Sequence, residues 1–114
     1  MKKLLTLIAV ATLSMTAVAN DNPKVEASQS YAQMQAFDKY CGMLEDVYLN
    51  NDGIMHADKL YKRSVDVDAF VNVEFVNTQR AIAEDEFGGI VVCVKLKERL
   101  KRKGLFYGFF NSYL

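Results

Sequence analysis

Apolar side chains recur at helical spacing between residues 30 and 48. Five of them share one face of a helix because they are separated by three or four positions: Met34, Phe37, Cys41, Leu44 and Tyr48. Polar and charged residues fill the opposite face. We expect an amphipathic helix here, capped by Ser28 or Ser30 and ended by the turn-forming residues 50–53, with a cysteine on its buried stripe.

A shorter helical stripe follows within residues 54–63. Ile54, Ala57, Leu60 and Tyr61 have the spacing of one helix face. His56, the one histidine of the chain, lies in this segment. A single histidine without a partner motif is typical of a surface or core position, so we assign it no chemistry.

Residues 65–76 fit two patterns. Every second residue from Val65 to Phe75 is apolar, which indicates a strand, but Val67, Val71, Phe75 and Ile82 also form a helical stripe. The pattern continues to Phe87 without a turn residue before residues 88–89, both glycine. This length favours a helix that Asp66 caps.

The same ambiguity affects residues 90–103. Read as a strand, residues 90–97 place Cys93 on the side of Lys95 and Lys97, whereas a helix places it with Leu96 and Leu100. The helix puts both cysteines on apolar faces, as a buried disulfide between packed helices requires. We therefore predict an all-α fold, a small bundle of three or four helices stapled by one disulfide. The alternative is α+β, with strands near 65–76 and 90–97.

The N-terminal residues have the features of a signal peptide. Lys2 and Lys3 precede an apolar run over 4–15 that is too short to span a membrane, and residues 17–19 read Ala-Val-Ala. We predict cleavage near Ala19 and a periplasmic or secreted protein. Residues 20–28 are expected to be a flexible lead-in, and residues 29–114 a single helical domain.

Cys41 and Cys93 remain after such cleavage. In an exported domain an even, minimal pair indicates one disulfide, here closing a loop of 52 residues. The chain-entropy model gives about 4 kcal/mol of stabilisation for a loop of that length.

Charge is balanced overall but unevenly distributed. The 14 basic and 14 acidic residues cancel, yet residues 38–86 carry eleven acidic and five basic side chains, while six basic residues gather within 95–103. An exported protein is a poor candidate for binding nucleic acid. The basic helix indicates instead an acidic protein surface or an anionic membrane as the partner.

An aromatic segment follows this helix over residues 105–114. Five of its ten side chains are aromatic, and we expect the segment to fold back over the core, with a binding element as the alternative. We predict partner-binding residues on the basic helix and in the segment: Lys95, Arg99, Lys103, Phe106, Tyr107, Phe109 and Phe110.

Motifs of catalysis and metal binding are absent from the sequence. It has no glycine-rich phosphate loop, paired histidines or nucleophile-elbow serine, and the carboxylates of residues 84–86 point apart on a helix. We therefore predict a non-enzymatic protein without a cofactor, a metal or a small-molecule substrate.

In its signal peptide, length and cysteine count, the chain resembles small, helical, disulfide-stapled periplasmic proteins, which include immunity proteins of toxin-delivery systems and acid-stress chaperones. The residues after Cys41 lack the glycine and small-residue pattern of those immunity proteins, so no residue role is transferred. The expected function is binding of another protein, as an inhibitor or immunity-type partner. The alternative is a membrane-surface protein that acts through the basic helix and the aromatic segment.

Overall fold

The fold is a small helical bundle with a two-stranded ribbon at one side. A computed structural model describes residues 22–113. These residues contain four α-helices and two short strands, in the order α2 (Pro23–Glu45), β1 (Val47–Leu49), α3 (Asn51–Lys62), α4 (Val67–Glu84), α5 (Ile90–Arg102) and β2 (Phe110–Ser112). The predicted all-α fold is confirmed. The α+β alternative is wrong, because α4 and α5 occupy the segments where it placed strands. The expected signal peptide and its cleavage site lie outside the described residues.

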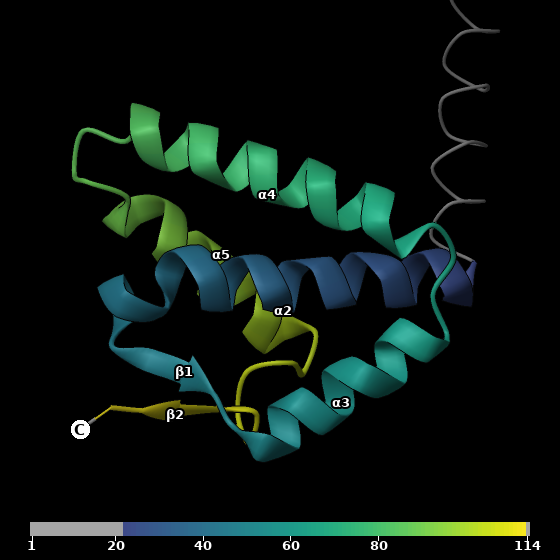
Figure 1. The fold of residues 1–114 in the computed structure, drawn as a ribbon. Helices are drawn as coiled ribbons and strands as arrows, with labels where there is room; N and C mark the ends of the chain where they lie inside the picture. The colour runs from purple at the N-terminus through teal and green to yellow at the C-terminus, as the bar shows by residue number, and fades with distance from the viewer. Residues whose placement is uncertain (1–21, 114) are drawn as a thin grey trace, which may run out of the picture.

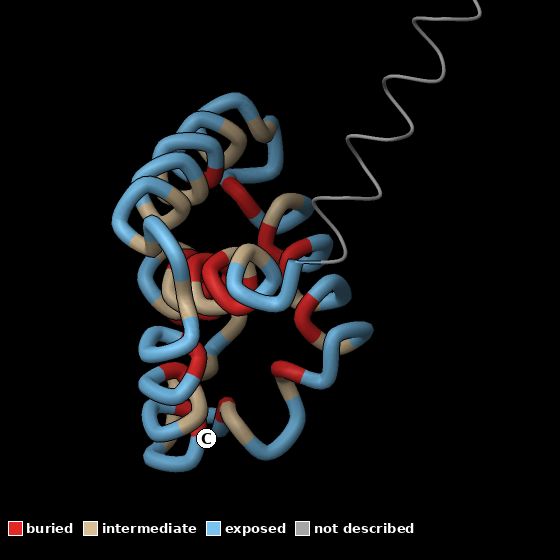
Figure 2. The backbone as a smooth tube through the Cα atoms, turned by 90° about the vertical axis from the view of Figure 1, so that its right-hand side faces the viewer, coloured by how far each residue is buried: buried red, intermediate tan, exposed pale blue. Residues whose placement is uncertain are grey.

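Helix α2 is the centre of the arrangement. It passes through the middle of the molecule, with α4 along one side, α3 and the ribbon along the other, and α5 behind it (Figure 1). Helix α2 contacts α3, α4, α5 and β1, whereas α4 and α5 contact each other far less. Buried segments accordingly gather where α2 meets its neighbours (Figure 2). The bundle is thus organised around one helix, with the others packed on it separately.

The predicted apolar stripe of α2 forms the core along most of its length. Met34, Phe37 and Cys41 are fully buried, and Leu96 and Leu100 of α5 pack in the same cluster. The C-terminal end of the predicted stripe does not belong to the core, because α2 stops at Glu45. Leu44 is 44% exposed and Tyr48 lies in β1.

Helix α2 begins earlier than the sequence analysis predicted. The side chain of Asn22 accepts hydrogen bonds from the backbone N–H groups of Lys24 and Val25, and Pro23 occupies the first turn, where a missing N–H costs nothing. The prediction of a flexible lead-in over 20–28 is therefore wrong for residues 23–28. The predicted caps, Ser28 and Ser30, are buried inside the helix.

Ser28 instead joins α2 to the loop between α3 and α4. Its hydroxyl oxygen accepts the backbone N–H of Val65 at 3.0 Å, and lies within donating distance of the carbonyl oxygens of Val65 (2.7 Å) and Lys24 (2.8 Å). The side chain is fully buried. One serine thus satisfies the backbone of a loop residue that is 37 positions away.

The predicted end of the first helix at residues 50–53 is also wrong. The helix ends at Glu45 and is followed by Asp46, whose backbone is left-handed with φ of 58°, and Asn50 caps the start of α3. The Asn50 side chain accepts the N–H of Gly53 at 2.8 Å and donates to the carbonyl of Gly108 at 3.1 Å. Asn50 is a turn residue, but it starts a helix rather than ending one.

The disulfide joins α2 to α5 as predicted. Cys41 and Cys93 are bonded, both are fully buried, and no free cysteine occurs in residues 22–113. The helical interpretation of residues 90–103 is confirmed by the burial of Leu96 and Leu100 on the same face. A disulfide of this kind is compatible with an exported protein.

The connection between α4 and α5 is a tight corner. Gly88 and Gly89 have positive φ angles of 74° and 102°, a conformation that suits glycine. A Cβ atom at Gly89 would lie 2.9 Å from Ile82 and 3.1 Å from Leu44, so the backbone also approaches α2 closely. The two glycines thus lie in the break between α4 and α5.

The aromatic segment folds back onto α2, as expected. The ring of Phe37 makes edge contacts with the rings of Phe106 and Phe110, at centroid distances of 5.9 and 5.3 Å. Strand β2 then pairs antiparallel with β1, with Phe110 opposite Leu49. The segment therefore completes the core on one side of α2.

Candidate functional site

The basic residues predicted to bind a partner lie along one side of α5. Lys95 and Arg99 are exposed and line a hollow of about 470 Å³ between α4 and α5, where Glu74 of α4 also lies. The Lys103 ammonium lies 3.5 Å from the carboxylate of Glu26 on α2. These cations are therefore near acidic side chains of the same chain, and Lys103 is paired with one of them.

The predicted aromatic residues do not form one surface. Phe110 is buried and Phe106 is half-buried, while the ring of Phe109 stacks on His56 with a centroid distance of 4.6 Å. Tyr107 is the exposed member, at 72%. The seven predicted residues are thus divided between the side of α5, the core and the N-terminal end of α3. Their role in binding stays a prediction.

A different group of side chains forms an apolar surface at the α4–α5 corner. We call it the corner patch, and it consists of Leu44, Phe87, Ile90, Val91 and Val94. Each member is between 39% and 62% exposed. The corner projects at the left of Figure 1, beside the C-terminal end of α2.

The members of the corner patch are neighbours. Ile90, Val91 and Val94 belong to the first turns of α5, and Phe87 and Val91 line the same shallow hollow of about 460 Å³. Leu44 joins them because it lies against the backbone at Gly89, next to Ile90. The exposed residues therefore make a continuous apolar surface.

Charged residues border the corner patch on two sides. Glu84 and Glu86 are exposed and line the hollow beside Phe87, whereas Lys95 follows Val91 by one helical turn. The carboxylate of Asp85, between the two glutamates, accepts the backbone N–H groups of Phe87 and Val91 and so belongs to the structure of the corner. The patch thus has an acidic border and a basic border.

The corner patch is not among the binding residues predicted from the sequence. The stripe of Cys93, Leu96 and Leu100 gives the buried face of α5, but residues 90–94 contain more apolar side chains than one stripe can bury. Ile90 and Val94 are apolar residues that the buried stripe does not include. This excess of apolar residues is the feature of the sequence that could have indicated the corner patch.

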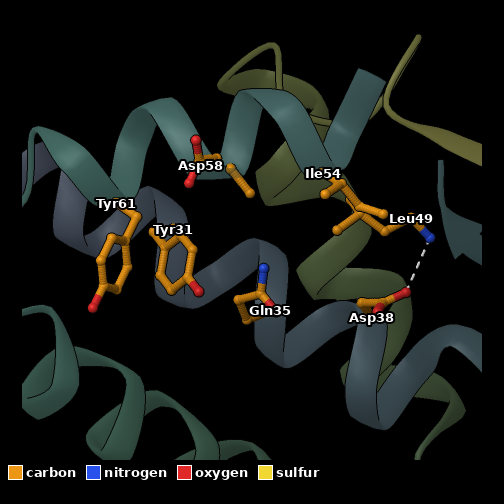
Figure 3. Close-up of a pocket in the computed structure, with 8 residues that line it drawn as sticks. Tyr31, Gln35, Asp38, Leu49, Ile54, Asp58 and Tyr61 are labelled. Atoms are coloured by element: carbon orange, nitrogen blue, oxygen red, sulfur yellow. Dashed lines mark hydrogen bonds between the residues drawn. The ribbon is translucent and has the colours of Figure 1, made fainter. Parts of the chain in front are cut away.

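A second hollow, the tyrosine groove, lies between α2 and α3. It has a volume of about 480 Å³, and the residues that line it include Tyr31, Gln35, Asp38, Ile54, Asp58 and Tyr61. Figure 3 shows the two tyrosine rings side by side near one end, Gln35 in the middle, and Asp38 near the other end. The two rings meet edge to face with a centroid distance of 5.3 Å.

The tyrosine groove has an acidic character. Asp38 and Asp58 line it, and no lysine or arginine does so among the described residues. One carboxylate oxygen of Asp38 accepts the backbone N–H of Leu49 at 3.0 Å (Figure 3). Burial raises the pKa of the Tyr31 hydroxyl, and Tyr61, Asp68 and Asp58 raise it further. The groove is thus a place of negative potential.

Within residues 22–113, no three side chains of histidine, cysteine, aspartate or glutamate come together in a group that could hold a metal ion. None of the helices in that part of the chain is long and apolar enough to cross a membrane.

Comparison with protein-family models, with curated proteins and with solved structures finds no match to this chain. The corner patch and the tyrosine groove are therefore the features from which a function can be proposed.

Proposed function

We propose that this protein is an exported, non-enzymatic domain that binds another protein through the corner patch. The observation that carries the proposal is the gathering of five exposed apolar side chains at one corner of the fold. Continuous exposed apolar surfaces are uncommon on monomeric proteins and mark sites of interaction. A role as inhibitor or immunity-type partner is the form of binding that the small, stapled fold suits.

The chemistry of the patch defines the partner. Phe87 is the largest and most exposed member, and a buried aromatic anchor is the usual centre of an interface. Glu84 and Glu86 border it on one side and Lys95 on another. We infer a partner with an apolar pocket for Phe87, basic residues opposite the glutamates and an acidic residue opposite Lys95.

Export to the periplasm or the cell exterior is part of the proposal. It is supported by the apolar run that precedes Ala17-Val18-Ala19 and by the single disulfide between buried cysteines. The membrane-surface alternative has less support, because it relied on an exposed aromatic segment. Phe110 and Phe106 pack on Phe37 instead.

Photo-crosslinking tests the proposal in the native compartment. The full chain would carry a photoreactive phenylalanine analogue at position 87, or at the control position 55, in the source organism; Met55 on α3 is 60% exposed, close to the 62% of Phe87. We expect a specific heterologous adduct from position 87 and none from position 55, because only Phe87 belongs to the corner patch.

The captured protein would then be purified and its affinity measured by calorimetry. We expect Phe87→Ser to weaken binding by at least about tenfold, as for the loss of an interface anchor, and Met55→Ser to leave it unchanged. Thermal unfolding of both variants shows that they are folded. Equal affinity of Phe87→Ser and the unaltered protein, or an adduct only between two copies of this chain, would overturn the proposal.

A further inference from the structure

We infer that the tyrosine groove is a binding site for an organic cation, an ammonium or guanidinium group carried on a short aliphatic chain. The inference is independent of the corner patch. It rests on the combination of two aromatic rings, two carboxylates and apolar side chains in one hollow, with no cationic residue among those that line it.

The aromatic end of the groove suits a positive charge. A cation is attracted to the electron-rich face of an aromatic ring within about 6 Å of its centroid. Tyr31 and Tyr61 meet edge to face, so the face of one ring is next to the edge of the other and the pair forms a corner. Such a corner can contact a cation from two directions.

The carboxylates of Asp38 and Asp58 supply the negative charge that a bound cation requires. Asp38 uses one oxygen for the N–H of Leu49, which fixes its orientation and leaves the other oxygen as an acceptor. Asp58 lies across the groove on α3 and pairs with Lys62 at 3.0 Å. That pair is exposed and lies within a single helix, so it is weak and a bound cation can compete with it.

The apolar residues indicate the rest of the ligand. Leu49 and Ile54 line the groove near Asp38, and the carboxamide of Gln35 lies between that end and the tyrosines (Figure 3). An alkyl chain can lie against the two aliphatic side chains while its charged end reaches the tyrosines. The groove thus fits a free alkyl amine or guanidine, and it equally fits the side chain of an arginine or lysine in a peptide.

Nuclear magnetic resonance of the ¹⁵N-labelled, disulfide-bonded protein tests the inference. The probes are butylguanidinium chloride, the neutral analogue 1-butanol, and the peptide acetyl-Gly-Arg-Gly-amide. We expect saturable shifts of the Leu49 amide and of amides around Tyr31 and Tyr61 with butylguanidinium, and none with butanol. A peptide that binds more tightly than butylguanidinium identifies a protein side chain as the ligand, whereas weaker binding identifies a free small cation.

Three variants test whether the charge of the groove, and not only its shape, determines the binding of the cation. Asp58→Asn removes the charge of the groove carboxylate that interacts with the Tyr31 hydroxyl, at the end where the cation lies, so it should weaken binding about fivefold or more. Lys62→Gln removes the competing ammonium from Asp58 and should tighten binding. Glu98→Gln, which removes an exposed carboxylate of α5 outside the groove, should change nothing.

Absence of saturable shifts with either cationic probe, or equal shifts with 1-butanol, would overturn the inference. So would unchanged affinity in both Asp58→Asn and Lys62→Gln, because the Asp58 carboxylate would then have no part in binding. None of these results bears on the corner patch, so the two proposals can fail separately.

Discussion

The carboxylate of Asp85 accepts a hydrogen bond from the backbone N–H of Val91, six residues further along the chain, at 3.0 Å. It also accepts the N–H of Phe87 at 2.9 Å and that of Val92 at 3.2 Å. The residue at the N-cap position of α5 is Gly89, which has no side chain to satisfy these groups. One aspartate therefore caps α5 from the far side of the α4–α5 corner.

The capping by Asp85 predicts a dependence of stability on pH. The hydrogen bond from Phe87, followed by those from Val92, Val91 and Gly89, lowers the pKa of Asp85 below its ordinary value of 3.8. A carboxyl whose pKa is lower in the folded protein stabilises the fold above its unfolded pKa, and this contribution is lost as the pH falls through the folded pKa. We expect Asp85→Asn to lower the melting temperature at neutral pH and to reduce the further loss of stability below pH 3.8.

Thermal unfolding followed by circular dichroism between neutral and acidic pH measures this effect. Glu86→Gln is the control, because Glu86 is the exposed neighbour of Asp85 and no hydrogen bond from the α5 N-terminus reaches it. Parallel pH profiles for Asp85→Asn and the unaltered protein would contradict the prediction.

The disulfide predicts a large effect of reduction on stability. Cys41 and Cys93 close a loop of 52 residues, for which the chain-entropy model gives about 4 kcal/mol. This is a large share of the stability of a small domain. We expect the midpoint of urea unfolding to fall strongly when a reductant is added.

The double variant Cys41→Ala/Cys93→Ala is the control for the reductant itself. It should unfold at a low urea concentration with or without the reductant. A reductant that leaves the midpoint of the unaltered protein unchanged would show that the bridge does not constrain the unfolded chain.

The aromatic segment offers a matched pair of substitutions. Phe110 is buried against Phe37, so Phe110→Ala should lower the free energy of unfolding by about 3 kcal/mol. Tyr107 is 72% exposed, so Tyr107→Ala should change it by no more than about 0.5 kcal/mol. Urea unfolding measures both, and similar costs for the two variants would contradict the packing described here.

Ser28 offers a test of the contact between α2 and the α3–α4 loop. Ser28→Ala leaves the backbone N–H of Val65 without its partner, which should cost about 1 to 3 kcal/mol of unfolding free energy. Ser30→Ala should cost less, since the hydroxyl of Ser30 is 3.5 Å from Glu26 on the same helix. Hydrogen exchange gives a second measurement, in which the Val65 amide should exchange faster in Ser28→Ala alone.

The sequence predicts the helices well where one apolar stripe decides their position. The stripe of Cys93, Leu96 and Leu100 located α5, and the absence of a turn residue before Gly88 located α4. Both segments also alternate like strands, and the length of the pattern and the match of the two cysteines resolved that ambiguity. The pairing of two cysteines that are distant in the sequence thus distinguished helix from strand where the local alternation of apolar residues did not.

The ends of α2 were predicted wrongly for two different reasons. The pair Asn22-Pro23 is a start signal for a helix, and it was available in the sequence but was taken as part of a lead-in. At the other end, β1 has three residues and pairs with β2 about 60 residues later. No local pattern predicts so short a strand, because the strand with which it forms hydrogen bonds is distant in the sequence.

The candidate sites were less predictable than the fold. The corner patch could have been suspected from the surplus of apolar residues in 90–94, but the tyrosine groove could not. Tyr31 and Tyr61 are 30 positions apart and have no motif in common. Only the packing of α3 against α2 brings the two rings within 5.3 Å.

The ring of Phe110 and the strand that begins there have a consequence for the order in which an exported chain can fold. Residues 110–112 pair with β1, and Phe110 covers Phe37 at the middle of α2. An exported chain that has crossed the membrane only as far as α5 therefore contains every helical segment of residues 22–113 but has an uncovered core. Such a chain exposes the apolar surface that chaperones recognise, so acquisition of the native state must await the passage of residues 105–112.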